Sequence, residues 1–313
     1  MKNIIEITNL SKIFGKFTAV DKINLTVREG EIFGFLGPNG AGKTTTISML
    51  TTLIHPTSGT VNISGYDLLN DGVDIRNIIG VVPQTFALFP ELTAQENLNY
   101  IGKLYGMSSS KIKERSKQLL KQVSLYTYKD RITGVFSGGM KQRLSLAASI
   151  MSSPKILFMD EPTTGLDPQS RIAMREITQK LNKQGITIIY TTHDMDEAEK
   201  ICDRIVIMDK GKIIADGTSA ELKKLMIPDK VLEVKTEKLE KETLAELKKM
   251  HSVTAVHEKD NGILNITVKK DEHIFYELTD FFKKRKLFLE ELKYLEPSLE
   301  DVFVHLTKKD LRD

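Results

Sequence analysis

The sequence predicts a large α/β domain built on a parallel sheet, followed by a small α+β domain. Two apolar runs, Ile156–Met159 and Ile186–Tyr190, have the unbroken hydrophobicity of central parallel strands and lead into polar residues. A third run, in residues 32–36, is joined to a helix pattern by a glycine-rich turn. Beyond residue 228 the pattern changes to strands and helices in the order β-α-β-β-α-β. A chain of 313 residues is long enough for one large core and one small one.

Composition excludes several other classes of protein. The chain is 40% hydrophobic and 28% charged, as in globular proteins, and it carries no apolar run of the roughly 18 residues that a membrane span needs. Its first residues are too polar for a signal peptide, so we expect a cytoplasmic protein. A net charge of +3 is too small to indicate a nucleic-acid partner, and none is expected. The single cysteine, Cys202, allows no internal disulfide and no cysteine-based metal cluster.

Residues 30–50 combine a strand, a glycine-rich turn and a helix, and they read GEIFGFLGPNGAGKTTTISML. Within them, Gly37 to Thr44 match G-x-x-x-x-G-K-[ST], the phosphate-binding P-loop. Backbone N–H groups of such a loop cradle the β- and γ-phosphates of a nucleotide, while a lysine bridges them and a hydroxyl binds Mg²⁺. We therefore expect Lys43 to bridge the phosphates and Thr44 to hold Mg²⁺.

The next apolar strand leads into a polar residue and then a helical region. Gln84 follows the run IIGVVP, either as part of the phosphate site or as an ordinary loop glutamine. An apolar loop over residues 85–92 precedes two helix patterns, at 93–106 and 110–125, the first of which opens with a capping box of Thr93 and Glu96. We expect a helical subdomain over about residues 85–150.

The stretch VFSGGMKQRLSLAASI, which begins at Val135, indicates an anion contact at the start of a helix. Ser137 stands at the N-cap position, and Gly138 and Gly139 fill the first turn, where each glycine costs about 1 kcal/mol relative to alanine. Glycines at a helix start let backbone N–H groups approach a ligand closely, and the helix dipole favours an anion. The expected ligand is a phosphate.

Two further apolar strands are followed by candidate catalytic residues. Asp160 and Glu161 follow the run ILFM, and carboxylates at the carboxyl edge of a parallel sheet lie where ligands bind. The pair is either a helix N-cap or, beside a P-loop, a Mg²⁺ ligand followed by the residue that orients the attacking water. His193 ends the next strand, which favours a γ-phosphate sensor over a structural histidine.

Residues 229–313 read as a separate accessory domain. The expected elements are strand 230–237, helix 239–250, a hairpin over 253–269 that turns at Asn261 and Gly262, helix 271–285 and strand 287–296. Their order predicts a ferredoxin-like sandwich, with Pro228 and Asp229 as the linker. No chemical constellation is evident in this domain.

Taken together, these motifs resemble the nucleotide-binding subunit of ABC transporters over about the first 220 residues. In the order of that family, the chain carries Walker A at GPNGAGKT, the Q-loop at Gln84, the signature at FSGGM, Walker B at ILFMDE, the D-loop at Asp167 and the switch histidine at His193. The resemblance implies a P-loop NTPase fold over residues 1–228, with a RecA-like parallel sheet, an antiparallel β subdomain and a helical subdomain. It also implies that an early aromatic, here Phe14, stacks on adenine, although a core-packing role for Phe14 is the alternative.

The resemblance implies a site for ATP and Mg²⁺. Catalysis is expected from Glu161, His193, Gln84 and Lys43, and metal binding from Thr44, Gln84 and Asp160. Nucleotide contacts are expected from Phe14, Gly37, Pro38, Asn39, Gly40, Ala41, Gly42, Lys43, Thr44, Thr45, Ser137, Gly138, Gly139 and Asp167.

Two substitutions in the signature and the C-terminal extension narrow the resemblance. Phe136 stands where the family commonly has leucine and Met140 where it has glutamine; because Ser137 and the backbone make the anion contact, hydrolysis should survive both. The SGGM form, together with the ending PSLEDVFVHLT, resembles daunorubicin-resistance ATPases of the ABC-2 exporter type.

The implied function is ATP hydrolysis that powers export of drugs, lipids or other small molecules. The implied partners are a second copy in a head-to-tail, ATP-dependent dimer, in which each signature closes on the other copy's ATP, and a separate membrane permease. The permease would hold the chain at the cytoplasmic face of the membrane, with the apolar loop next to Gln84 as its docking site; a local hydrophobic core is the alternative for this loop. A soluble ABC ATPase in cluster assembly or another non-transport process is the alternative, and a nucleotide-binding protein without hydrolysis is disfavoured because all the catalytic residues are present.

Overall fold

The computed structural model describes residues 2–225, 230–237, 239–258, 263–268, 274–295 and 297–307. The chain divides into two compact units, Met1–Ser219 and Ala220–Lys309. This division falls before the predicted boundary, and the predicted linker residues Pro228 and Asp229 lie outside the described residues. In the part of the chain that the structure describes, no helix is long and apolar enough to span a membrane.

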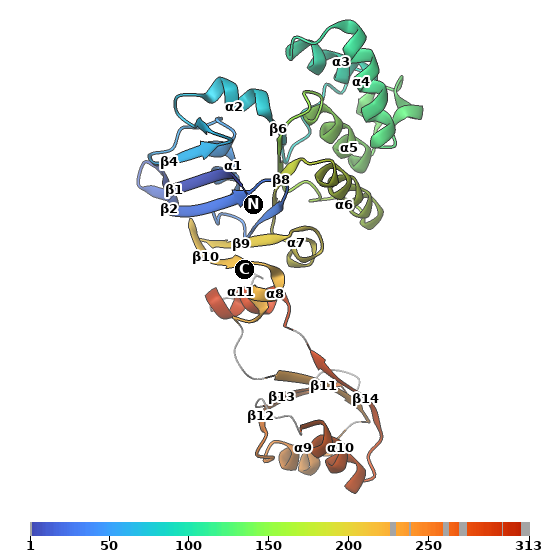
Figure 1. Ribbon diagram of the computed structural model, residues 1–313. Coiled ribbons are helices and arrows are strands. Elements are labelled where there is room, and N and C mark those ends of the chain that lie inside the picture. Colours follow the sequence, from blue (N-terminus) through green and yellow to red (C-terminus); the bar gives the residue numbers. More distant parts are fainter. Residues whose placement is uncertain are drawn as a thin grey trace. The chain divides into compact units, whose positions relative to one another are not determined.

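A six-stranded, mainly parallel sheet forms the centre of the first unit (Figure 1). Its strand order is β10-β9-β3-β8-β7-β6, and all neighbouring strands are parallel except β9 and β10. Strands β3, β7 and β8 are buried along their whole length, as their unbroken apolar runs predict. The strands are β3 (Ile32–Leu36), β6 (Ile79–Val82), β7 (Ile156–Asp160), β8 (Thr187–Thr192), β9 (Arg204–Asp209) and β10 (Lys212–Gly217).

The central sheet separates two hydrophobic cores, because successive side chains of a strand point to opposite faces. In β7, Ile156 and Phe158 belong to one core, whereas Leu157 and Met159 belong to the other. The first core is shared with a second, antiparallel sheet of order β2-β1-β4-β5. That sheet contains β1 (Asn3–Phe14), β2 (Phe17–Arg28), β4 (Ser58–Ile63) and β5 (Tyr66–Asp67).

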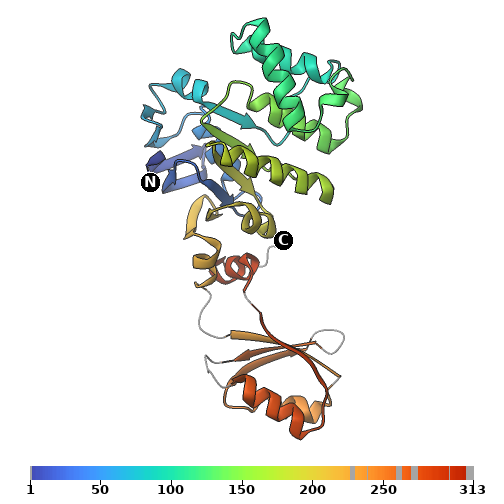
Figure 2. The same cartoon turned by 45° about the vertical axis from the view of Figure 1, so that its right-hand side comes forward.

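The other core joins the central sheet to a helical subdomain, whose helices α3, α4 and α5 gather together in both views (Figures 1 and 2). They span α3 (Ala94–Leu104), α4 (Ser109–Gln122) and α5 (Gly138–Ser149), and short 3₁₀ turns at Tyr126–Tyr128 and Thr133–Val135 connect α4 to α5. The predicted capping box is confirmed, since Thr93 accepts a hydrogen bond from the Glu96 N–H and Glu96 accepts one from the Thr93 N–H. The remaining helices of this unit are α1 (Lys43–Leu50), α2 (Gly72–Ile78), α6 (Pro168–Lys183) and α7 (Met195–Ile201).

The second unit contains a four-stranded antiparallel sheet of order β12-β13-β11-β14 with its own hydrophobic core. Along the chain the elements run β-α-β-β-α-β as the sequence predicts, an order typical of ferredoxin-like sandwiches. They are β11 (Lys230–Thr236), α9 (Lys241–Leu247), β12 (Val253–Glu258), β13 (Ile263–Val268), α10 (Ile274–Lys284) and β14 (Leu289–Leu295). Two helices that the sequence analysis missed, α8 (Ser219–Lys223) and α11 (Leu299–Thr307), flank the sandwich in sequence. The predicted hairpin turn at Asn261 and Gly262 lies outside the described residues.

Candidate functional site

A loop between β3 and α1 lines a cavity of about 180 Å³ at the carboxyl edge of the central sheet. Gly42, the residue before α1, adopts a left-handed backbone with φ of 103°, and a Cβ there would lie 2.6 Å from the carbonyl oxygen of Ala19. Only glycine fits both conditions. The lining residues are Phe17, Ala19, Asn39, Gly40, Ala41, Gly42, Lys43, Thr44, Thr45, Gln84 and Glu161.

Lys43 is buried at the base of this loop, although it carries an ammonium group. Its Nζ donates to the carbonyl oxygens of Gly37 at 2.7 Å and Pro38 at 3.1 Å, and it lies 3.3 Å from Glu161 Oε1. Burial lowers the Lys43 pKa, an effect larger than the opposing attraction of Glu161 and Asp160. The loop therefore holds a desolvated cation, the kind of group that gains most from an anionic ligand.

Asp160, at the end of β7, is anchored by two hydroxyl groups. Its Oδ1 accepts from Thr191 Oγ1 at 2.6 Å, and Thr44 Oγ1 lies 3.3 Å from the same oxygen. Thr191 was not predicted from the sequence; the signal that points to it is a hydroxyl residue at the carboxyl end of β8, beside β7. The structure therefore brings together the two expected metal ligands, Thr44 and Asp160, in a hard-oxygen environment.

Glu161 occupies a strained backbone position. Its φ of 46° lies in the left-handed region, which costs a non-glycine residue about 1–3 kcal/mol. Two bonds from its N–H hold it there, to Thr191 Oγ1 at 2.9 Å and to the Thr191 carbonyl oxygen at 3.2 Å. Strain of this kind accumulates at functional sites, where the surrounding structure fixes the direction of a side chain.

The Glu161 carboxylate links the P-loop lysine to the histidine at the end of β8. One oxygen faces Lys43; the other lies 3.1 Å from His193 Nδ1 and accepts from Thr164 Oγ1 at 3.2 Å. Burial raises the Glu161 pKa, but Lys43 and His193 together outweigh it and hold the pKa below its ordinary value. Glu161 is therefore an ionised carboxylate at neutral pH, the state that a general base requires.

A second acid that the sequence analysis missed, Glu197 of α7, supports this arrangement from behind. Its Oε1 accepts from the Tyr190 hydroxyl at 2.8 Å, and its Oε2 accepts from Thr163 at 2.6 Å and from Thr192 at 3.3 Å. These partners come from β8 and from the turn after Glu161. Glu197 thus ties the turn that bears Glu161 to β8, the strand that precedes His193.

The expected signature residues lie at the start of α5, apart from the cavity lined by the P-loop. Ser137 is the N-cap, and its Oγ accepts from the Met140 N–H at 3.3 Å. A Cβ on Gly139 would lie 2.1 Å from Ser170 Oγ, so this glycine is required where α5 meets α6. Ser170 in turn donates to Asp167, the N-cap of α6, at 2.7 Å. The signature and the D-loop are therefore packed into one surface of the chain.

Two aromatic residues face each other at the tip of the β1–β2 hairpin, where Phe14 pairs with Phe17. Both rings are about half exposed or more, but Phe17 lines the cavity and Phe14 does not. Lys12 Nζ lies 5.0 Å from the centre of the Phe14 ring. Phe17 is thus a second candidate for contact with a planar base, one that the sequence analysis missed; Phe14 stays a prediction.

Comparisons with known proteins agree with this geometry. A protein-family model described as "ABC transporter" matches residues 20–164. The linearmycin resistance ATP-binding protein LnrL of Bacillus subtilis (strain 168) is 39% identical over 313 residues, which cover 99% of this chain and 100% of that protein. The Nod factor export ATP-binding protein I of Burkholderia lata is 38% identical over 313 residues, which cover 99% and 98% of the two chains. A solved dimeric structure of the ATP-binding cassette MJ0796, in a post-hydrolysis state bound to ADP and Pi, is 30% identical, covers 68% of this chain and 98% of that one, and has a TM-score of 0.63.

The fold and the site define an ATP-binding cassette of the P-loop NTPase class, and proteins of this class bind and hydrolyse ATP. More narrowly, the chain belongs to the ABC transporter family, as an ATP-binding subunit and an ATPase. Its full-length relatives carry names of resistance and of export, which confirms the predicted resemblance to exporter ATPases. ATPases of this family generally dimerise and act with membrane permeases.

Proposed function

We propose that this chain hydrolyses ATP to power an ABC-2 type exporter of drugs, lipids or other small molecules. The observation that carries the proposal is the position of Glu161, whose two carboxylate oxygens face Lys43 and His193 beside the P-loop. A carboxylate held ionised at this point orients the attacking water and accepts its proton, while Lys43 and the loop N–H groups stabilise charge on the γ-phosphate. His193, half exposed at its side chain, contacts the γ-phosphate from the other side.

Thr44 and Asp160 would hold Mg²⁺ together with phosphate oxygens of the nucleotide. Thr44 lines the cavity and its Oγ1 lies 3.3 Å from Asp160 Oδ1, and Mg²⁺ is commonly bound by one or two carboxylates plus substrate phosphates. Among the described residues, no cluster of three or more histidine, cysteine or acidic side chains could hold a metal. Held by Thr44 and Asp160, such an ion would supply positive charge that offsets the charge of the phosphates. Gln84, which lines the same cavity, is proposed as a further ligand.

The proposed dimer is a head-to-tail pair of identical chains. Ser137, Gly138 and Asp167 are exposed and lie outside the chain's own P-loop cavity, so they are available to a nucleotide held by another copy. The dimeric structure of the MJ0796 cassette supports a dimer, without specifying its orientation. In the proposed head-to-tail dimer, Ser137 and the α5 backbone N–H groups would contact the γ-phosphate bound by the other copy.

The permease is proposed to dock on the apolar loop that follows Gln84. Phe86 and Phe89 of this loop are each 42% exposed, and the Phe89 ring packs edge-on against Tyr100 of α3 at 4.7 Å. A docked segment here would contact the helical subdomain and the Gln84 region together, which would couple γ-phosphate contacts to the membrane subunit. Such docking would place the chain at the cytoplasmic face of the membrane. The alternative, a soluble ATPase of cluster assembly, is less well supported, because the relatives that match the whole chain are named for resistance and export.

Coexpression with the product of the neighbouring reading frame tests the proposal, which requires that product to be a membrane protein. We expect the two proteins to elute together in detergent and the permease to change the ATPase rate. The double variant Phe86→Asp/Phe89→Asp should lose both effects but keep basal hydrolysis, whereas the control Leu53→Asp/Val73→Asp, at two exposed apolar residues elsewhere on the chain, should keep both. Wild-type coupling in the loop variant would refute the docking site. Failure of the wild-type chain to hydrolyse Mg-ATP would refute the proposed function.

A further inference from the structure

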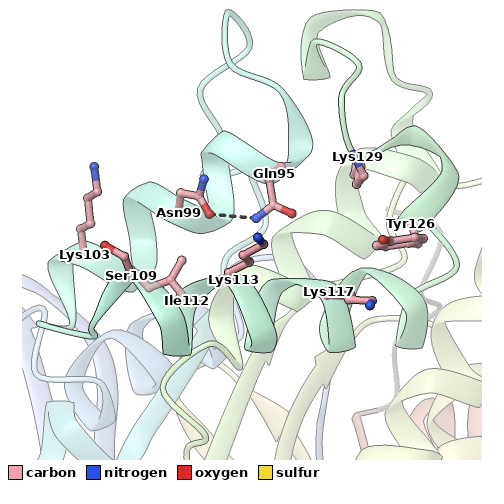
Figure 3. A pocket seen from close by; sticks show the side chains of 9 residues that line it. All are labelled: Gln95, Asn99, Lys103, Ser109, Ile112, Lys113, Lys117, Tyr126 and Lys129. Atoms are coloured by element: carbon pink, nitrogen blue, oxygen red, sulfur yellow. Dashed lines mark hydrogen bonds between the residues drawn. The ribbon is translucent and has the colours of Figure 1, made fainter.

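The helical subdomain contains a second cavity, a groove of about 530 Å³ between α3, α4 and the turn that follows α4 (Figure 3). One wall carries Gln95, Asn99 and Lys103, which recur every four residues along α3. The opposite wall carries Lys113 and Lys117, four residues apart on α4. A volume in the range of 300–1,000 Å³ is typical of small-ligand sites, so this groove is large enough to receive a ligand.

The groove is positively charged. Its lining includes Lys103, Lys113, Lys117 and Lys129, and within the described chain it includes no acidic side chain. Lys129 forms an ion pair with Asp130, but the structure shows no ion pair for the other three lysines among the residues it describes. The neutral polar groups add hydrogen-bond donors. Gln95 Nε2 donates to Asn99 Oδ1 at 2.8 Å, so the Asn99 oxygen already accepts a hydrogen bond and its N–H groups can donate to a ligand (Figure 3).

This charge arrangement is not explained by the stability of the helices. Lys113 and Lys117 are spaced i,i+4, and like charges at that spacing destabilise a helix by about 0.2–0.5 kcal/mol. Helix α4 has no acidic residue in its first turn, where Lys111 stands close to the positive end of the helix dipole. Helix α4 carries one acidic residue, Glu114, beside four lysines and one arginine, and a helix selected only for stability would balance these charges more evenly. The lysines therefore point to a ligand.

We propose that this groove binds a phosphate-bearing anion with two or more negative charges. Lysine ammonium groups are compact point charges that bind phosphate oxygens from any direction, and a phosphate with two or more negative charges gains more from several of them than a singly charged carboxylate does. Besides Ile112 and Tyr126, the residues that line the groove are lysines, amides and a serine, whose polar ends can all contact an anion. The inference stands apart from the export function proposed above.

The phosphate group could belong to a soluble compound or to a phospholipid headgroup. The soluble source is tested by titrating inorganic pyrophosphate into the full-length chain saturated with ADP, so that the P-loop is already filled. We expect calorimetry to show binding that weakens as salt rises. The variant Lys113→Gln/Lys117→Gln should bind about tenfold more weakly or worse. The control Lys111→Gln/Lys155→Gln removes the same charge from exposed lysines outside the groove and should bind as the wild type does. Normal basal ATPase rates in both variants show that they are folded.

The lipid source is tested by flotation of the same three proteins with vesicles of phosphatidylcholine alone or of equal parts phosphatidylcholine and phosphatidic acid. Binding in either arm that the groove variant loses and the control keeps supports the proposal, and the arm in which it occurs identifies the source. Binding in neither arm, or equal losses in the two variants, would overturn it. Tighter groove-dependent binding of polyglutamate than of pyrophosphate would also overturn it, in favour of an acidic protein segment.

Discussion

Glu161→Gln is the substitution that tests the proposed mechanism most directly. The amide keeps the size of the side chain and the strained backbone at this position, but it removes the negative charge that faces Lys43 at 3.3 Å and His193 at 3.1 Å. A neutral amide cannot accept a proton from water at neutral pH. The phosphate-binding loop is left unchanged, so ATP should still bind.

The magnitude of the effect follows from two contributions. Loss of a positioned general base lowers a rate by about 10²–10⁴, which corresponds to about 3–5 kcal/mol of transition-state stabilisation. The direct attraction between Lys43 and Glu161 across 3.3 Å is about 5 kcal/mol at an effective dielectric constant of about 20, and the desolvation of both groups opposes it. Because the carbonyl oxygens of Gly37 and Pro38 still satisfy Lys43, we expect the free energy of unfolding to fall by only about 1–3 kcal/mol.

The assay combines steady-state hydrolysis of Mg-ATP, equilibrium ATP binding and size-exclusion chromatography. We expect the variant to lose nearly all turnover and to retain ATP binding. It should also elute as a stable dimer with Mg-ATP, because the ATP that holds the two copies together is no longer hydrolysed. Glu176→Gln is the matched control, because it makes the same chemical change at an exposed acid on α6. Hydrolysis by Glu161→Gln at the wild-type rate would remove this residue from its assigned role.

Three further predictions rest on particular contacts. Gly139→Ala should lower the free energy of unfolding by about 1–3 kcal/mol, because its Cβ would clash with α6, whereas Gly138→Ala, with only a 3.7 Å neighbour, should leave it unchanged or raise it by up to about 1 kcal/mol. Thr191→Val should lower it by about 1–3 kcal/mol and also slow hydrolysis, because Asp160 loses a donor and the Glu161 N–H loses an acceptor. The depressed pKa of Glu161 means that its carboxylate stabilises the fold above its ordinary value of 4.5, and this contribution is lost as the pH falls through the folded-state pKa. The melting-temperature gap between wild type and Glu161→Gln should therefore narrow on acidification.

Each of these predictions has a contrary outcome. Equal stability of the two glycine variants in chemical denaturation would show that α6 yields to the added methyl group. A Thr191→Val protein with wild-type stability and rate would show that the two acids are positioned by other contacts. A melting-temperature gap that stays constant or widens at acid pH would mean that the Glu161 pKa is not depressed.

The sequence alone determined the parts of this protein that depend on local order. The P-loop needs a strand, a glycine-rich turn and a helix in succession, and Gly37 to Thr44 display all three. Strands such as residues 156–159 are apolar throughout because both of their faces are buried, and such a run can be recognised from the sequence alone. Asp160, Glu161 and His193 could be placed at one edge of the sheet because the carboxyl ends of parallel strands meet there. The order of elements in the second unit was likewise readable from its alternating patterns.

Only the tertiary structure decided which residues meet across the chain. Thr191, Glu197 and Phe17 escaped the sequence analysis, because a threonine, a glutamate or a phenylalanine has no special spacing until its strand or helix is packed beside another. Gly139 shows the same limit: the sequence explained it by an anion, whereas the folded chain also requires it for the close approach of α5 to α6. Local pattern is set by the period of a helix or strand, but contacts between distant segments depend on how those elements pack.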